Sequence, residues 1–200
     1  MSLSPDQKTA IHAAISARYA KVAACPGRGF KYPTGAAGLA GLGYGPELLT
    51  DVPGQAMEYF CGVGNPFSLG RIEPGQTVLD VGCGAGADTL VAAGLAGESG
   101  LVVGLDPSAD MLARARGALS AAGRGRVFFL RADAEDIPLA SSSVDVILSN
   151  GAMNLVVDKD RALAGMWRTL RPGGALRLAD QTLIREPSAC PRDPAETWFR

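Results

Sequence analysis

The stretch Val78-Leu-Asp-Val-Gly-Cys-Gly-Ala-Gly86 decides the fold of this chain. It runs from a short apolar segment, residues 77–81, into three glycines spaced two residues apart, and a helical pattern begins at Asp88. A strand that turns through glycines into a helix is typical of the first unit of an open α/β sheet. Glycines at such a turn let the main chain approach a ligand closely. We therefore expect a ligand site at this turn.

The alternation of strands and helices continues after the glycines. Apolar runs occur at residues 101–105, 127–130, 144–148 and 175–179, helical patterns at 109–122 and from the cap Asp158 to residue 170, and a turn at Leu170-Arg-Pro-Gly-Gly174. Strands that are apolar almost throughout are covered on both faces, which predicts a parallel sheet. With right-handed crossovers, the predicted fold class is α/β, with a doubly wound, mostly parallel, Rossmann-like sheet.

The region before the glycine turn has a different character. Ser4, Pro5 and Gln7 form a capping-box pattern ahead of a short amphipathic helix, and residues 25–74 are rich in Gly and Pro. The helix either covers the core or forms a lid over a ligand cleft. We expect three parts: an N-terminal helix and cap region (1–74), a ligand-binding core (75–183) and a Pro-rich tail (184–200).

Composition excludes several classes of protein. The 200 residues include 19 Lys and Arg against 20 Asp and Glu, so the formal net charge of −1 gives no reason to bind nucleic acid or anionic lipid. No signal-peptide pattern or membrane-spanning run is present, which predicts a cytoplasmic protein. The four cysteines contain no C-x-x-C pair and His12 is the single histidine, so we expect neither a disulfide framework nor a metal site.

Asp106 ends the second predicted strand, about twenty residues after Gly86. A carboxylate at that place can accept both hydroxyls of a ribose. The spacing Gly82-x-Gly84-x-x-Ala87 also fits a loose dinucleotide fingerprint, so a nicotinamide-dependent oxidoreductase is an alternative. The negative charge of Asp80 would disfavour a pyrophosphate there and favour a sulfonium nucleoside that carries an ammonium group. Downstream, the chain also offers no Ser/Tyr/Lys set typical of a dehydrogenase.

Residues 74–180 resemble the class I S-adenosylmethionine-dependent methyltransferases. The matching stretches are Val78–Gly86 above, Gly104-Leu-Asp-Pro107, Ala132-Asp-Ala134, Asp145-Val-Ile-Leu-Ser-Asn150 and Leu170-Arg-Pro-Gly-Gly174. The resemblance implies S-adenosylmethionine as cofactor and a set of cofactor-binding positions: Asp80, Gly82, Cys83, Gly84 and Gly86 along the methionine and ribose, Asp106 on the ribose hydroxyls, Pro107 and Met111 flanking the adenine, Asp133 and the Ala134 amide at the adenine amino group, and Asn150 toward the methyl group.

A narrower resemblance points to the arsenite methyltransferases. It rests on Tyr59-Phe-Cys-Gly-Val-Gly-Asn-Pro66, Pro74-Gly-Gln-Thr-Val-Leu-Asp80, Ser149-Asn-Gly-Ala-Met-Asn-Leu155 and Asp158-Lys-Asp160. That family binds trivalent arsenic, a soft ion, through cysteine thiolates. Cys25 and Cys61 are the matching candidates on the substrate side. The family's cysteine after Ser-Asn is Gly151 here, so the arsenic-binding set is incomplete.

We therefore expect a methyltransferase for a small molecule, with a cofactor-binding protein that transfers no methyl group as the alternative from a different class. Cys83 belongs to the glycine turn, and Cys190 to the tail.

About twenty residues follow Asp180, too few for a further helix and two strands. We accordingly expect residues 175–179 to form an exposed sheet edge that could pair two copies, and the chain to be a shortened form of a longer enzyme.

Overall fold

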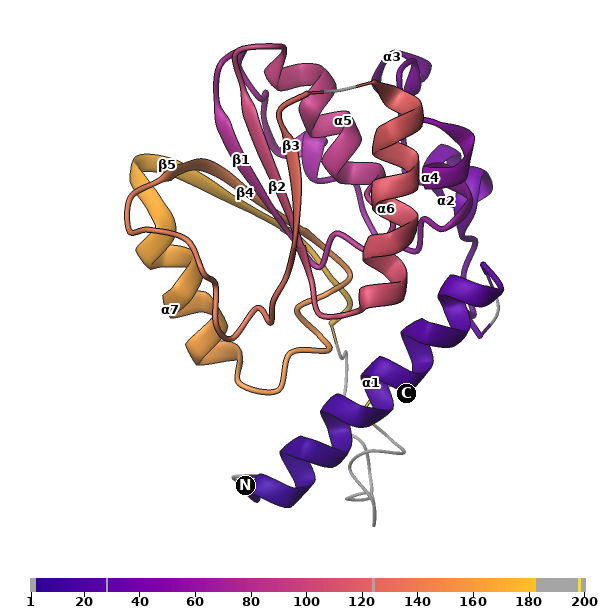
Figure 1. Ribbon diagram of the computed structural model, residues 1–200, viewed down its shortest axis with the longest axis vertical. Coiled ribbons are helices and arrows are strands. Elements are labelled where there is room, and N and C mark those ends of the chain that lie inside the picture. Colours follow the sequence, from indigo (N-terminus) through magenta and orange to yellow (C-terminus); the bar gives the residue numbers. More distant parts are fainter. Residues whose placement is uncertain (1–2, 28, 124, 183–197, 199–200) are drawn as a thin grey trace.

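The computed structural model describes residues 3–27, 29–123, 125–182 and 198 (Figure 1). Five strands follow an all-helical beginning, with a helix between each consecutive pair except the third and fourth strands. In chain order the elements are α1 (Pro5–Ala24), α2 (Gly35–Gly41), α3 (Pro46–Leu49), α4 (Gly54–Glu58), the 3₁₀ helix η1 (Pro66–Leu69), β1 (Thr77–Val81), α5 (Ala87–Ala96), β2 (Leu101–Asp106), α6 (Ala109–Ala122), β3 (Val127–Arg131), β4 (Val144–Asn150), α7 (Lys159–Thr169) and β5 (Leu170–Ala179).

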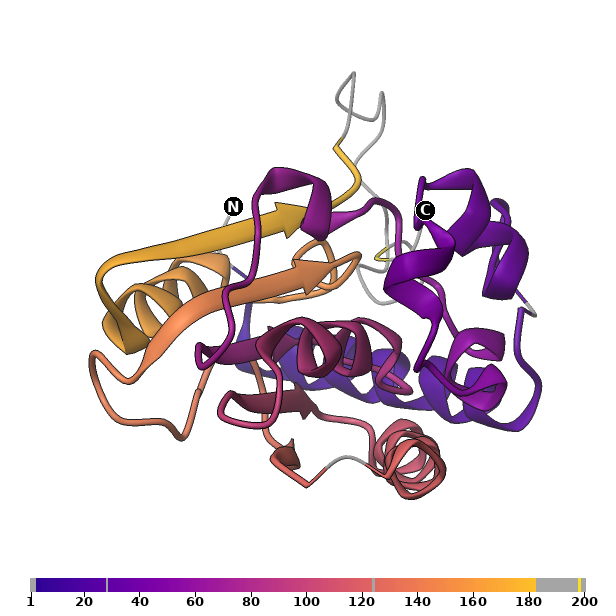
Figure 2. The ribbon, with the colours of Figure 1, turned by 90° about the horizontal axis from the view of Figure 1, so that it is seen from above.

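The sheet is parallel throughout, in the order β3-β2-β1-β4-β5 (Figure 2). The strand order reverses at β1: β2 and β3 follow on one side of it, and β4 and β5 on the other. Alternate residues of β1 serve opposite faces: Val78 packs with α5 and α6, and Leu79 packs with Met166 of α7. The predicted doubly wound α/β fold is confirmed, and its ligand crevice is expected beyond the carboxyl ends of β1 and β4.

Strand β5 begins earlier than predicted. The turn expected at residues 170–174 lies inside the strand as an irregularity, because Val144 pairs with Leu170 while Val146 pairs with Ala175. Gly173, with a φ of 82°, allows this excursion. Among the described residues β5 occupies one end of the strand order, as predicted for this segment.

The N-terminal region contributes one long helix and several short ones. The predicted capping box is confirmed, since the Gln7 amide donates to the Ser4 hydroxyl at 3.2 Å and the Ser4 amide to the Gln7 side chain at 2.9 Å. Helices α3 and α4 pack on α5 and α6 through Val52, Ala56 and their neighbours. Helix α1 instead runs diagonally across one end of the sheet (Figure 1). Apart from Trp198, the predicted tail lies outside the described residues.

Candidate active site

A cavity of about 450 Å³ lies between α1 and the carboxyl ends of the strands. Val81, Leu105 and Asn150 line it from the ends of β1, β2 and β4. The opposite wall is α1, which contributes His12, Ile15, Ser16 and Tyr19. The volume suits a ligand of nucleoside size. This geometry favours the interpretation of α1 as a lid.

The glycine turn forms the floor of the cavity. Gly82, Gly84 and Gly86 have φ values of 76°, 53° and 87°, which disfavour any residue with a Cβ. The amides of Gly82 and Cys83 both donate to the Leu105 carbonyl, at 2.8 and 3.0 Å, so the turn is fixed to β2. Gly82 and Gly84 line the cavity, whereas Gly86 packs against Phe129 and Ala115. Gly86 therefore supports the turn on its core side and does not face the cavity.

Asp106 lines the same cavity at the end of β2. Its carboxylate accepts from the Gly84 amide at 2.9 Å and from the Ser108 amide at 2.8 Å. Each oxygen keeps a free lone pair, so two ribose hydroxyls can still bind. Burial raises the pKa of this carboxyl to about 6, against the two amide hydrogen bonds, which lower it. The side chain thus also holds the glycine turn in place.

Two further carboxylates are buried beneath the turn. Asp80 accepts from the Thr89 hydroxyl at 2.6 Å, and Asp88 accepts from the Tyr44 hydroxyl at 2.6 Å. Burial raises the pKa of both carboxyls, and the charge of Asp88 raises that of Asp80 further. Neither forms an ion pair with a Lys, Arg or His of the described residues. An ammonium group bound nearby would offset this buried negative charge.

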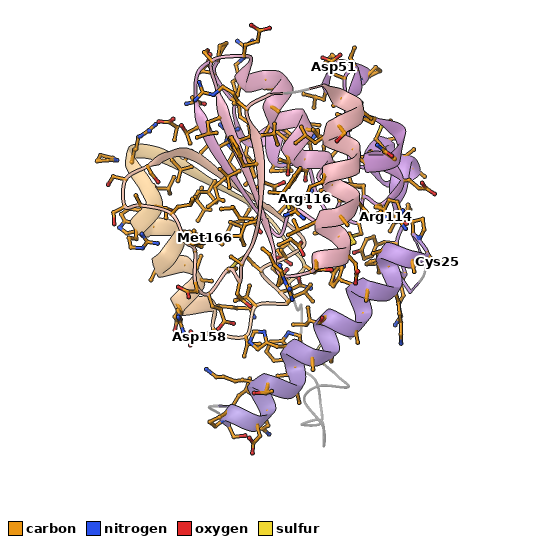
Figure 3. The ribbon with its side chains drawn as sticks, in the orientation of Figure 1. Cys25, Asp51, Arg114, Arg116, Asp158 and Met166 are labelled. Atoms are coloured by element: carbon orange, nitrogen blue, oxygen red, sulfur yellow. The ribbon has the colours of Figure 1, made fainter. Side chains whose placement is uncertain are left out.

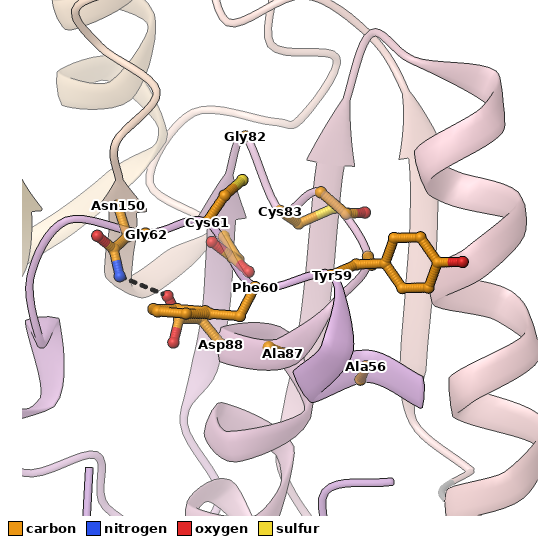
Figure 4. A pocket seen from close by; sticks show the side chains of 13 residues that line it. Ala56, Tyr59, Phe60, Cys61, Gly62, Gly82, Cys83, Ala87, Asp88 and Asn150 are labelled. Carbon is orange, nitrogen blue, oxygen red and sulfur yellow. Dashed lines mark hydrogen bonds between the residues drawn. The ribbon is translucent and has the colours of Figure 1, made fainter. Parts of the chain in front are cut away.

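These carboxylates border a second, small cavity of about 40 Å³. Cys61, Cys83 and Asn150 surround it together with the glycine turn (Figure 4). Cys61, Gly82, Gly84 and Asn150 line the small cavity and the large one alike. The two cavities therefore meet at the glycine turn, beside Cys61.

The residues predicted for the adenine gather at the other end of the large cavity. Pro107, Asp133 and Ala134 line it there, together with Arg131, which donates to the Pro107 carbonyl at 3.2 Å. Met111 does not line it. Its side chain is fully buried behind Gly84, with its terminal methyl group close to the glycine. The expectation that Met111 flanks the adenine is therefore replaced by a supporting position, because the helix register of α6 turns it into the core.

The Asn150 amide serves a different purpose from the one expected. Its oxygen accepts from the amides of Val63 and Gly64, at 2.8 and 3.1 Å. Its nitrogen donates to the Gly64 carbonyl at 2.8 Å, to Asp88 at 3.0 Å (Figure 4) and to the Tyr44 hydroxyl at 3.2 Å. The amide group is thus fully engaged within the protein. Asn150 clamps the loop after Cys61 onto β4 and α5 rather than offering its amide to a ligand.

Cys25 and Cys61 do not converge. Cys61 lines both cavities, and burial raises the pKa of its thiol to about 12. Cys83 packs in the core beside Gly104. Cys25 is exposed at the C-terminal end of α1 and lines neither cavity (Figure 3), and Cys190 lies outside the described residues. Within the part of the chain that the structure describes, no cluster of three His, Cys, Asp or Glu side chains could hold a metal ion.

Several lining residues were not predicted from the sequence. Arg131 ends β3 and Val156 follows β4; neither belongs to a motif, so only the fold brings them to the cavity. Leu155 ends the Ser149–Leu155 motif, but that motif gave no reason to place it at the cavity. The sequence did indicate that Ile15 and Tyr19 face the interior, since both lie at the helical spacing of the apolar face of α1. His12 also lines the cavity, although a lone helical histidine is usually a surface residue.

Comparison with known proteins agrees with this geometry. A family profile described as a methyltransferase domain matches residues 72–194. An arsenite methyltransferase of Halobacterium salinarum is 36% identical over 147 residues, which is 74% of this chain and 37% of that protein. One of Aquipseudomonas alcaligenes is 41% identical over 133 residues, 63% of this chain and again 37% of the relative. The chain thus spans about two fifths of the length of these relatives.

A ubiquinone/menaquinone biosynthesis C-methyltransferase of Vibrio vulnificus is 39% identical over 104 residues, covering 52% of this chain and 40% of its own. Among solved structures, the crystal structure of an arsenic(III) S-adenosylmethionine methyltransferase from Chlamydomonas reinhardtii superposes with a TM-score of 0.62. The sequence identity is 36%, over 67% of this chain and 47% of that one. No helix of the described residues is long and apolar enough to cross a membrane.

Proposed function

The chain belongs to the class I S-adenosylmethionine-dependent methyltransferases, and from that premise we propose that it transfers a methyl group to a small molecule bound beside Cys61, with trivalent arsenic as the first candidate. The observation that carries the proposal is that Cys61 lines the junction of the two cavities, next to Gly82 and Asn150. The nicotinamide-dependent alternative loses its support, because the family's cofactor is S-adenosylmethionine.

The residues present fit that cofactor. Asp106 would accept the ribose hydroxyls, and Asp133 with the Ala134 amide would bind the adenine edge. Gly82 and Gly84 leave space beside the backbone for the ligand. The buried Asp88 carboxylate carries a negative charge above its pKa of about 6, and an ammonium group bound nearby would favour ionisation of Asp80 as well. When bound, the cofactor supplies a sulfonium methyl group that a nucleophile can attack directly. The protein's own contribution is then orientation and exclusion of water, which require no general base.

The acceptor end favours a soft, thiol-binding substrate. Burial keeps Cys61 protonated, so the free thiol is a weak nucleophile, whereas binding of a soft metalloid ion would displace its proton. The hydroxyls of Tyr19 and Tyr32 lie near Cys61, and Tyr32 donates to the Cys61 carbonyl at 3.0 Å. One thiol alone binds such an ion less firmly than several, so we expect slow arsenite methylation.

A second candidate function follows from the exposed position of Cys25. With Cys61 as the one cysteine that lines the large cavity among the described residues, the chain could bind the cofactor without methylating arsenic, either as a cofactor-binding protein without transfer activity or as an enzyme for another small acceptor. The relatedness to a quinone C-methyltransferase makes phenols the next acceptors to test. The possible homodimer through β5 and the cytoplasmic location stay predictions.

Incubation of the purified chain with S-adenosylmethionine and arsenite, and then with small thiols and phenols, tests the proposal through release of S-adenosylhomocysteine. We expect turnover with arsenite that Cys61→Ser abolishes and that the matched variant Cys25→Ser retains. Turnover with a phenol alone would move the acceptor to another class. Cofactor binding without turnover on any acceptor would favour the non-transferring protein.

A further inference from the structure

Helix α1 is held over the cavity differently at its two ends. Near its C-terminus, Val22 and Ala23 are buried against Tyr59, Ala85 and Met111, and Arg114 of α6 donates to the Ala23 carbonyl at 3.1 Å. Toward the N-terminus the contacts to the loops beyond β3 and β4 are ionic. Lys8 lies 3.5 Å from Asp158, and His12, one turn later, lies between Asp133 and Glu135. Figure 3 shows Asp158 beside this part of α1.

Each nitrogen of the His12 imidazole faces a carboxylate. Nδ1 lies 3.6 Å from Oδ2 of Asp133, and Nε2 lies 3.8 Å from Oε1 of Glu135. Glu135 is itself fixed, because the same Oε1 accepts from the amides of Val157 and Asp158, at 3.0 and 2.9 Å. The ring is therefore held between one anchored carboxylate and one at the adenine end of the cavity.

The Asp133 carboxylate is fixed from both sides. Its Oδ1 accepts from the Glu135 amide at 2.9 Å, while Oδ2 faces His12. The His12 Nδ1 contact at 3.6 Å is longer than a hydrogen bond, so both lone pairs of Oδ2 stay open to an adenine amino group while the imidazole lies against the carboxylate. Without the imidazole, rotation about the terminal side-chain bond would be restrained by Oδ1 alone.

The pair contributes little to the stability of the helix. The side chains of His12 and Asp133 are 41% and 38% exposed, and ion pairs at such positions add little to folding. The apolar contacts near Val22 keep α1 docked without it. A function of His12 should thus appear in ligand binding rather than in folding.

We propose that His12 is a positioning residue of the cofactor site: it orients the Asp133 carboxylate toward the adenine amino group, and so sets the preference of the site for adenine over a base without that amino donor. The inference rests on the proposed function, since it requires the adenine to lie at Asp133. A merely structural role for His12 would change the affinity for both bases equally.

Calorimetry with S-adenosylhomocysteine and S-inosylhomocysteine, which carries a carbonyl in place of the amino group, tests this. We expect the wild-type chain to prefer the adenosyl compound by about tenfold or more, and His12→Ala to lose most of that preference with an unchanged melting temperature. His12→Asn, which keeps an N–H donor, should restore part of the preference. Lys8→Ala, the matched control on the same face of α1, should keep the full preference.

Asp133→Ala, which leaves no side-chain acceptor at this position, separates the possible failures. If it abolishes the preference while His12→Ala leaves it intact, or if His12→Ala weakens both ligands equally, the positioning role of His12 is wrong and the cofactor site stands. If Asp133→Ala also keeps the wild-type preference, the adenine does not lie at Asp133, and the cofactor placement itself is wrong.

Discussion

The two halves of the cavity are built from different kinds of sequence. The cofactor half consists of residues at strand ends, such as Asp106 and Asp133, whose backbone is set by the parallel sheet. The acceptor half brings together Tyr19 of α1, Cys61 of a loop and Gly151 after β4, which are far apart in the chain. The first half follows from a fold that many methyltransferases share. The second depends on loops, and loops are where specificity resides.

The largest expected effect is a loss of stability when the loop of the acceptor half is no longer hydrogen-bonded to β4. Asn150→Ala removes the clamp that ties Val63 and Gly64 to Asp88 and Tyr44. We expect the free energy of unfolding to fall by about 2–4 kcal/mol, since several buried partners lose their hydrogen bonds. Urea denaturation measures this. Asn154→Ala is the control, because its side-chain oxygen has no partner among the described residues and its loss should cost less.

The next effect concerns the cofactor half. Asp106→Ala should weaken binding of S-adenosylmethionine by about 1.5–3 kcal/mol, because a charged hydrogen-bond acceptor disappears. The hydrogen bonds that Asp106 accepts from the Gly84 and Ser108 amides predict a modest loss of stability as well. Calorimetry and thermal melting measure the two. Asp110→Ala, an exposed residue of α6, should change neither, and unchanged affinity in Asp106→Ala would contradict the placement of the ribose.

The same carboxylate predicts a pH dependence. Its pKa of about 6 in the free protein means that the ionised form, which accepts the ribose hydroxyls, predominates above pH 6 and is lost below it. Affinity for S-adenosylhomocysteine should therefore be level near pH 7.5 and about tenfold weaker at pH 5. In Asp106→Asn this dependence should shrink to the part that comes from Asp80 and Asp88, whose pKa values burial also raises. An equal decline in that variant would assign it to another group.

The smallest expected effect comes from adding a second cysteine to the acceptor half, at position 151. A Cβ at Gly151 would meet Val63 at 3.6 Å and the Cys61 carbonyl at 3.7 Å, ordinary contacts, although the φ of 71° disfavours a side chain. Gly151→Cys should therefore fold with a small loss of stability and tighten arsenite binding by about fivefold, because a second thiol reaches the first. Gly151→Ala carries the same strain without the thiol. Equal arsenite binding by both variants would mean that positions 61 and 151 do not share a ligand.

The difference between the halves also explains what could be predicted from the sequence. The strands, the glycine turn and Asp106 follow from local patterns, because apolar runs and glycine spacing act over a few residues. The clamp made by Asn150 could not be predicted, since its partners lie more than sixty residues away. Met111 shows the same limit: the family resemblance implies a place beside the adenine, but the register of α6 directs its side chain into the core. His12 acquires its place only when α1 crosses the cavity.

Titration of S-adenosylmethionine into the purified chain, with competition by S-adenosylhomocysteine and by NAD, tests the central claim most directly. The account predicts one site per chain, displaced by S-adenosylhomocysteine and unaffected by NAD, because the buried Asp88 carboxylate, which is ionised above its pKa of about 6, repels a pyrophosphate at the glycine turn. Failure to bind S-adenosylmethionine, or its displacement by NAD, would contradict the claim that this cavity is a methyl-donor site.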